Sequence, residues 1–202
     1  SVNETKIYNK NNKPYVFIDD IRLKGKHNLS NLIAAATVSK LMKVDDKIIK
    51  RTMQSFNGID HRLQIVGEIN NVIYINDSKA TNIHSVIVAI NSFEKPIILL
   101  LGGKNKNSDF RLLLPHTKRH VKHIVSYGEA GGEIATAIGD AVRLNRVSSL
   151  SQAVASAHNL ASPGDIVLMS PGCASFDEFK NFEGRGKKFT DLVNDLAGVA
   201  CD

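Results

Sequence analysis

The chain has 202 residues, of which 43% are hydrophobic and 23% charged, a balance typical of a folded globular protein and not of a disordered one. Its longest apolar run covers residues 96–101, far short of the roughly 20 residues that a membrane-spanning helix needs. Residues 1–13 are too polar for a secretory signal, so we expect no membrane span and no export.

The formal net charge is +6, and most of the basic excess lies in residues 1–60. A nucleic-acid-binding protein usually gathers such residues on one surface with aromatic side chains between them. Here they are spaced like the solvent face of a helix, which argues against nucleic-acid binding. The residues concerned are Lys40, Lys43, Lys47, Lys50 and Arg51.

The two cysteines, Cys173 and Cys201, cannot build a disulfide framework, and no Cys-x-x-Cys pair is present to hold a metal. We therefore expect a cytoplasmic protein with no metal site in this chain.

Residues 1–58 predict one edge strand at 15–18 and two helices, at 28–42 and 45–55, the second capped by the Asp45 carboxylate. These elements bury too little to form a domain alone. We expect them to be the end of a domain that begins upstream, with Asn57-Gly58 as a hinge for domain motion.

Residues 59–202 alternate short apolar runs with helical patterns, and strand starts recur at the spacing of βαβ units. Continuous apolar strands indicate a parallel sheet that is covered on both faces. The predicted fold is α/β, a doubly wound, mostly parallel, Rossmann-like domain. The expected strands are 72–75, 97–101, 124–127, 141–144 and 166–169, and the expected helices are 85–92, 132–138, 150–161 and 189–196.

Unusual polar segments follow three of these strands, where an open parallel sheet binds its ligands. They are Asn76-Asp77-Ser78-Lys79-Ala80-Thr81-Asn82, Gly102-Gly103-Lys104-Asn105-Lys106 and Ser170-Pro171-Gly172-Cys173-Ala174-Ser175-Phe176. Glycines allow close backbone approach, lysines attract anions, and small hydroxyl residues before a helix accept an anion. Each segment could also be an ordinary helix cap or turn, and the first an internal Asp–Lys pair. Together they predict a pocket for a small acidic ligand.

Other candidate motifs are weaker. No Gly-x-x-x-x-Gly-Lys-Ser/Thr loop and no Gly-x-Gly-x-x-Gly fingerprint occurs. His116, His120 and His123 have helical spacing, but the lysines and arginine between them would repel a cation, so we expect a surface helix. Cys173 precedes a predicted helix, and without an evident His partner we expect a structural role for it.

These three segments, with Lys180-Asn181-Phe182-Glu183, resemble the Mur ligases, and among them the enzymes that add D-glutamate. His27-Asn28-x-x-Asn31 is similar to a late motif of the family's central domain, and His61-Arg62 to the start of its C-terminal domain. The resemblance runs from about Leu23 to the end. Two positions depart from the family pattern: Ile83, where proline is expected, and Gly172, where alanine is usual.

The resemblance implies an ATP-dependent ligase that joins D-glutamate to UDP-N-acetylmuramoyl-L-alanine through an acyl phosphate, in peptidoglycan precursor synthesis. It implies Lys79 and His61 as catalytic residues. D-Glutamate would be bound by Thr81, Lys106, Ser175 and Phe182, with Lys104 as an alternative to Lys106. The nucleotide would be bound by Asn28, Asn31, His61, Arg62 and Asp77.

The resemblance also implies three domains, of which this chain holds residues 1–58 from the ATP-binding central domain and 59–202 as the amino-acid-binding domain. The uridine site, the phosphate loop and the Mg2+ ligands would lie upstream, so the chain alone should be inactive. We expect a monomer whose partners are these domains and its small-molecule substrates. The alternatives are another Mur-type or folylpolyglutamate-type ligase, or a non-catalytic module that binds an amino acid or nucleotide.

Overall fold

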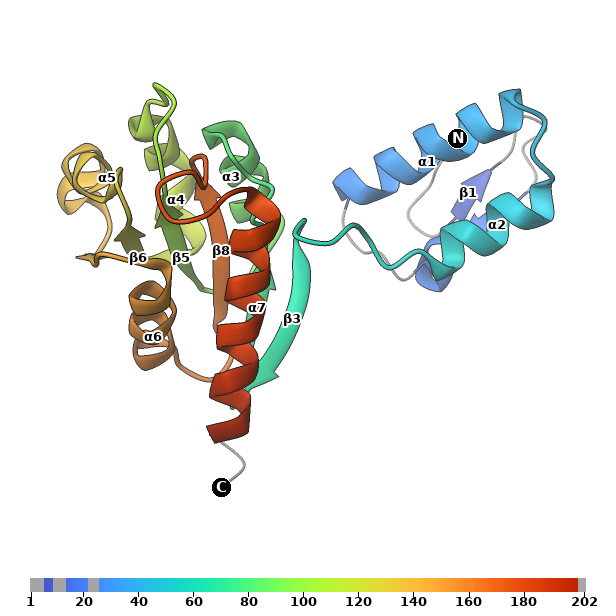
Figure 1. The fold of residues 1–202 in the computed structure, drawn as a ribbon. Helices are drawn as coiled ribbons and strands as arrows, with labels where there is room; N and C mark the ends of the chain where they lie inside the picture. The colour runs from blue at the N-terminus through green and yellow to red at the C-terminus, as the bar shows by residue number, and fades with distance from the viewer. Residues whose placement is uncertain (1–5, 9–13, 22–25, 200–202) are drawn as a thin grey trace. The chain divides into compact units, whose positions relative to one another are not determined.

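The computed structural model describes residues 6–8, 14–21 and 26–199, and these divide into two compact units, residues 1–58 and 59–202. Leu23, where the resemblance begins, and Cys201 lie outside the described residues. Figure 1 shows the elements of both units.

Unit 1 (residues 1–58) is a two-stranded antiparallel sheet with two α-helices. Its elements are β1 (Lys6–Tyr8), β2 (Pro14–Phe17), the 3-10 helix η1 (Ile18–Asp20), α1 (Lys26–Leu41) and α2 (Asp46–Ser55). The predicted cap of the second helix is confirmed, because the Asp45 carboxylate accepts a hydrogen bond of 2.7 Å from the Lys47 amide. The core of the unit is small and consists of Val16, Ile21, Leu32, Ile49 and Met53.

Unit 2 (residues 59–202) contains a six-stranded sheet with the order β3-β4-β8-β5-β6-β7. Its strands are β3 (Gln64–Ile69), β4 (Val72–Asn76), β5 (Ile97–Gly102), β6 (Val121–Tyr127), β7 (Leu144–Arg146) and β8 (Ile166–Gly172). All neighbouring pairs are parallel except β3 with β4, which form an antiparallel hairpin. The prediction of a doubly wound, mostly parallel sheet is confirmed.

Helices cover both faces of this sheet, as the apolar strands require (Figure 1). One face packs against α3 (Ile83–Ile90), η2 (Phe110–Leu113), α4 (Leu114–His120) and α5 (Gly131–Ile138). The other face packs against α6 (Leu150–Leu160) and α7 (Phe182–Val199). The central strand β5 is buried along its whole length.

Three element predictions were wrong. Residues 139–141 form the 3-10 helix η3 (Gly139–Ala141) and the strand begins only at Leu144, because the φ of Gly139 is +53° and turns the chain there. The last helix begins at Phe182, seven residues earlier than expected from its apolar positions. His123 is not on the helix of His116 and His120 but on strand β6, since the helix ends at His120.

Candidate active site at the carboxyl edge of the sheet

The polypeptide leaves three adjacent strands, β4, β8 and β5, toward opposite faces of the sheet. The chain after β4 enters α3 and the chain after β5 enters η2, both on one face, whereas the chain after β8 enters α7 on the other face. A crevice opens where neighbouring connections diverge in this way, and it is the usual ligand site of an open α/β sheet. The site is built from the β4 loop (residues 77–82), the β5 loop (residues 103–106) and the β8 loop (residues 173–181).

Asp77 is the first residue of the β4 loop, and the residue is only 5% exposed. Oδ2 accepts a 2.7 Å hydrogen bond from the Ser170 hydroxyl, and Oδ1 accepts a 3.2 Å bond from the Leu63 amide. Burial raises the pKa of Asp77 to about 6, although these bonds and the charge of Arg62 act in the opposite direction. The bonds run to Ser170 and Leu63, and the ion pairs found among the described residues do not include one to Lys79.

His61 lies beside the β4 loop in a left-handed backbone conformation, with φ of +63°. Its carbonyl accepts a 3.0 Å hydrogen bond from the Lys79 amide, and its Nδ1 lies 3.1 Å from the amide nitrogen of the buried Asn76 side chain. The Phe182 ring packs edge-on against the imidazole at 6.3 Å between centroids. The fold therefore brings His61, its neighbour Arg62 and Asp77 to one place.

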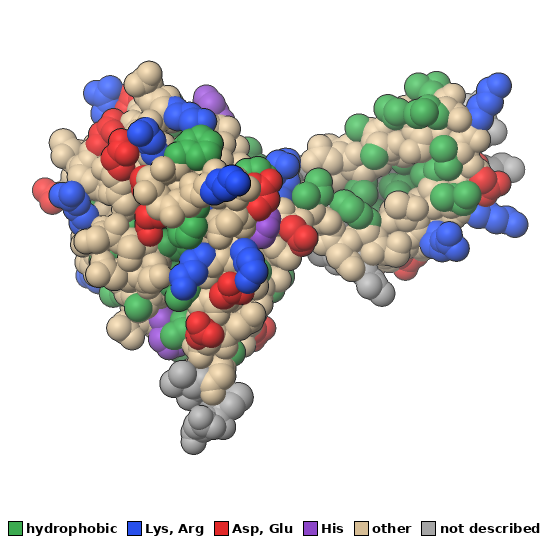
Figure 2. All heavy atoms as spheres, in the orientation of Figure 1, with side chains coloured by type: hydrophobic (Ala, Val, Ile, Leu, Met, Phe, Trp, Pro, Cys, Tyr) green, Lys and Arg blue, Asp and Glu red, His purple; other side chains and the backbone are tan. Residues whose placement is uncertain are grey.

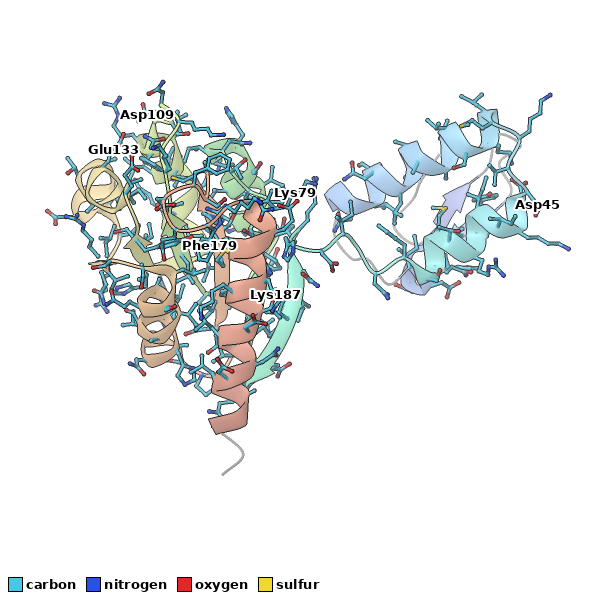
Figure 3. All side chains as sticks on the ribbon, viewed as in Figure 1. Asp45, Lys79, Asp109, Glu133, Phe179 and Lys187 are labelled. Carbon is cyan, nitrogen blue, oxygen red and sulfur yellow. The ribbon has the colours of Figure 1, made fainter. Side chains whose placement is uncertain are left out.

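A groove of about 490 Å³ adjoins His61, between this segment and the first turns of α7. Lys187 and Asp191 on its α7 side form an ion pair of 2.7 Å, and Lys187 is labelled in Figure 3. The residues lining the groove are Asp60, His61, Gln64, Glu183, Gly184, Lys187, Thr190 and Asp191.

The exposed Lys79 extends from the β4 loop toward the start of α7 (Figure 3), and its ammonium lies 5.4 Å from the centre of the half-buried Phe182 ring. Thr81, two residues further along, is half-buried. Both residues follow the carboxyl end of β4, so each can face a ligand in the crevice.

The β5 and β8 loops are joined by a short antiparallel bridge. The Lys104 amide donates to the Ala174 carbonyl at 2.8 Å, and the Ala174 amide donates back at 3.0 Å. Gly103 permits this approach, because its φ is +119° and a Cβ atom there would lie 2.3 Å from the Ala174 carbonyl oxygen. Ser175, which is 3% exposed, follows the bridge directly.

The side chains of the two candidate lysines differ. Lys104 pairs with Glu129 at 3.6 Å, whereas the Lys106 ammonium lies 5.5 Å from the centre of the Phe176 ring. Phe176 belongs to the β8 loop and is 62% exposed. Lys106 therefore faces the β8 loop without a carboxylate partner among the described ion pairs, and it has the freer charge for a ligand.

One expectation for this edge was wrong. The β8 loop does not enter a helix directly, since strand β8 continues to Gly172 and α7 begins only at Phe182, so no helix N-terminus lies behind Cys173. Burial raises the pKa of Cys173 to about 12, which agrees with a structural role. The described residues contain no group of three His, Cys, Asp or Glu side chains that could hold a metal.

The remaining predicted residues, Asn28 and Asn31, lie on α1 in unit 1. The sequence analysis missed the buried Arg185, which lies beneath the three loops. A signal was present, since Arg185 is spaced four residues before Phe189 and eight before Val193, on the buried face of α7. An arginine at such a position is normally assigned to solvent.

The open sheet and its diverging loops define a Rossmann-like domain whose carboxyl edge carries lysine and hydroxyl side chains. A family model described as "Mur ligase, glutamate ligase domain" matches residues 61–173. The chain belongs to the Mur ligase family.

Curated relatives agree with this assignment. The UDP-N-acetylmuramoylalanine–D-glutamate ligase of Salinibacter ruber is 38% identical over 88% of this chain and 39% of its own length. The enzyme of the same name from Christiangramia forsetii is 41% identical over 96% of this chain and 44% of its own length. The chain therefore spans less than half the length of these relatives.

A solved structure has the same fold. The MurF ligase from Thermotoga maritima in complex with ADP superposes with a TM-score of 0.60 at 14% identity, over 86% of this chain and 40% of that one.

In the part of the chain that the structure describes, no helix is both long and apolar enough to cross a bilayer.

Ile83 and Gly172, the two positions that the resemblance marks as departures, lie close to each other. Ile83 is the first residue of α3, after the cap Asn82, a position where proline is well tolerated. A Cβ atom on Gly172 would lie 3.3 Å from Ile83 Cδ1 and would also crowd Leu101 and Val86. The isoleucine side chain at position 83 therefore lies next to the space that an alanine methyl group would fill at position 172.

Proposed function

We propose that this chain is the C-terminal part of an ATP-dependent ligase that adds D-glutamate to UDP-N-acetylmuramoyl-L-alanine in peptidoglycan precursor synthesis. The observation that carries the proposal is the convergence of the β4, β5 and β8 loops at one sheet edge, which gathers Lys79, Thr81, Lys106 and Ser175. The names of the curated relatives support the choice of D-glutamate.

We assign D-glutamate to the space between the three loops. The ammonium of Lys106 and the hydroxyl of Ser175 would bind its carboxylates, since charge-assisted hydrogen bonds are the strongest available to a carboxylate. Thr81 would add a hydroxyl, and the Phe182 ring would pack on the methylene groups. Lys104 is the second choice for the carboxylate because Glu129 already neutralises it.

Within unit 2 we assign nucleotide binding to His61, Arg62 and Asp77, whereas the candidates Asn28 and Asn31 belong to unit 1. The buried Asp77 carboxylate can accept hydrogen bonds from ribose hydroxyls, and the exposed Arg62 can pair with phosphate. The groove of about 490 Å³ beside His61 offers room for part of the nucleotide. This assignment is consistent with ADP in the MurF neighbour.

The proposed reaction balances without a covalent enzyme intermediate. The carboxylate of the UDP-linked substrate takes the γ-phosphoryl group of ATP, which releases ADP and forms an acyl phosphate. The D-glutamate amine attacks the acyl carbon, the amide bond forms, and phosphate and a proton leave. The contribution of this chain is to position the amine and to stabilise charge, with Lys79 facing the phosphoryl oxygens and His61 orienting the nucleotide end.

Mg2+ is the usual companion of ATP in phosphoryl transfer. Because no group of three His, Cys, Asp or Glu side chains is found among the described residues, we assign it no ligand here and derive no step through it. Its ligands, like the phosphate loop, would belong to the upstream part of the enzyme.

We further propose that unit 1 is the end of the central ATP-binding domain. Among its described residues it has a core of five buried hydrophobic residues, and it exposes large apolar side chains such as Leu41 at 78% and Met42 at 75%. Figure 2 shows hydrophobic side chains on the surface of this unit. The upstream domains would cover such surface, in a monomeric enzyme of the cytoplasm, where ATP is supplied.

The test is phosphate release from ATP in the presence of UDP-N-acetylmuramoyl-L-alanine, with D-glutamate compared against L-glutamate, glycine and L-lysine. It is run on this chain and on the polypeptide extended upstream to include a phosphate loop. We expect turnover only in the extended form and only with D-glutamate. Turnover with another amino acid would favour a different Mur-type or folylpolyglutamate-type ligase. No phosphate release from either form would favour a non-catalytic binding module.

A further inference from the structure

Arg185, in the first turn of α7, is completely buried, with no exposed side-chain area. Arginine is almost never buried to this extent unless its charge is paired, because the desolvation of a guanidinium is costly. The ion pairs found within 4.0 Å among the described residues do not include Arg185. An ordinary salt bridge therefore does not account for its position.

The guanidinium donates instead to neutral acceptors in two of the loops that form the site. Nε donates to the Ser78 hydroxyl at 3.0 Å and Nη2 to the Ser78 carbonyl at 2.9 Å, both in the β4 loop. Nη1 donates to the carbonyl of Cys173 in the β8 loop at 3.1 Å. The Ser78 hydroxyl in turn donates to the Phe182 carbonyl at 2.7 Å, which ties the start of α7 to the same point.

The third loop lies directly against the same guanidinium. A Cβ atom built on Gly103, in the β5 loop, would lie 3.1 Å from Nη1 of Arg185. Only the flat fork of a guanidinium has donors in the directions that Ser78 and Cys173 require, and a lysine ammonium is a point charge. The Arg185 guanidinium is thus hydrogen-bonded to the β4 and β8 loops and lies next to Gly103 of the β5 loop.

Its charge acts on groups of the β8 loop. Burial raises the pKa of the neighbouring Cys173 thiol, and the charge of Arg185 opposes that rise. Burial also raises the pKa of Glu178 in the β8 loop, and the charge of Arg185 acts to lower it, although the two do not form an ion pair within 4.0 Å among the described residues. A cation hydrogen-bonded only to neutral acceptors favours a negative ligand nearby, because its field is weakly screened in a buried setting.

We propose that Arg185 is a positioning residue of the amino-acid site. Its guanidinium holds the β4, β5 and β8 loops in the relative placement that D-glutamate needs, and its buried charge favours the anionic amino acid. This rests on the proposed function in that the ligand is taken to be D-glutamate.

The first test asks whether Arg185 holds the three loops together, and it measures amide hydrogen exchange on this chain. We expect Arg185→Lys to speed exchange at the Lys104 and Ala174 amides, which join the β5 and β8 loops, by about tenfold, the loss of roughly one hydrogen bond's worth of protection. Phe189→Leu, on the same buried face of α7, is the control for general loosening of the helix. Equally faster exchange at these amides in both variants would show that Arg185 does not hold the loops together.

The second test uses the extended enzyme and varies D-glutamate and ATP separately. We expect Arg185→Lys and Arg185→Met to raise the D-glutamate KM by about tenfold or more, with Arg185→Met the worse of the two, and the ATP KM to change less than about twofold. A purely structural role would lower kcat with the amount of folded enzyme and leave both KM values alone, as Phe189→Leu should. Unchanged or equally changed KM values would overturn the proposal.

The two tests separate this proposal from the function on which it rests. If the unsubstituted extended enzyme does not turn over with D-glutamate, the proposed function fails, and the amino-acid part of this proposal fails with it. The exchange measurement then still decides whether Arg185 holds the loops together.

Discussion

Replacing Asp77 with asparagine should stabilise unit 2 at neutral pH and weaken nucleotide binding at the same time. The residue is 5% exposed, and burial raises the pKa of its carboxylate from 3.8 to about 6. Keeping the Asp77 carboxylate ionised in the folded state therefore costs free energy of desolvation. A residue that destabilises its own fold in this way is often kept for the ligand that it binds.

The magnitude follows from the difference between these two pKa values. About two units, at 1.36 kcal/mol each, correspond to about 3 kcal/mol for the ionised group. The folded state binds the proton more tightly than the unfolded state, so this group lowers stability as the pH rises through the interval between the two pKa values. Between pH 4.5 and 7.5 the cost should grow by about 2 kcal/mol.

Asparagine can keep the hydrogen bonds of the site. Its Oδ1 can accept from the Leu63 amide, and its amide group can donate to the Ser170 hydroxyl, which is free to turn. The substitution therefore removes the charge with little change in shape, and Asp77→Asn should bind nucleotide at least about tenfold more weakly in the extended enzyme.

The assay is urea unfolding of this chain and of Asp77→Asn, followed by circular dichroism at pH values from 4.5 to 7.5. We expect the variant to be more stable than the unsubstituted chain at pH 7.5. The difference between their free energies of unfolding should become smaller toward pH 4.5. Asp140→Asn, at an exposed position on η3, controls for the loss of one carboxylate. A variant less stable than the unsubstituted chain at pH 7.5, or a gap independent of pH, would refute the reasoning.

Three further predictions concern the same edge. Lys106→Ala in the extended enzyme should raise the D-glutamate KM about tenfold and leave the ATP KM nearly unchanged; a larger effect of Lys104→Ala would move the carboxylate site to that residue. Gly172→Ala should cost about 1–3 kcal/mol in urea unfolding, and adding Ile83→Val should recover part of it. An undiminished cost in the double variant would place the strain in the backbone, whose φ is +68° at this glycine. Cys173 should react with iodoacetamide at pH 8 far more slowly in the native chain than in urea, as measured by mass spectrometry; equal rates would contradict its burial and its pKa of about 12.

Much of the fold could be predicted because its signals are local. Strands β4, β5 and β8 contain continuous apolar runs, and the cap at Asp45 depends only on the residues that follow it. Strand β3 was missed because Gln64–Ile69 mixes polar residues and a glycine, as expected of an edge strand, and its pairing with β4 is antiparallel.

The sequence by itself also indicated which polar segments meet at one edge of the sheet. Parallel strands place their carboxyl ends at one edge, so polar segments after three strands had to gather there once the strands were identified. That inference needs only the order of apolar and polar runs along the chain.

The tertiary structure alone decided how those segments are held and charged. Asp77 meets Ser170, 93 residues away, and Arg185 meets Ser78, 107 residues away, so neither partnership leaves a local pattern. Burial, and with it the pKa of Asp77 and the unpaired charge of Arg185, depends on what other segments of the chain pack around a side chain. Such contacts are set by packing across the whole sheet, which the spacing of residues in one sequence does not encode.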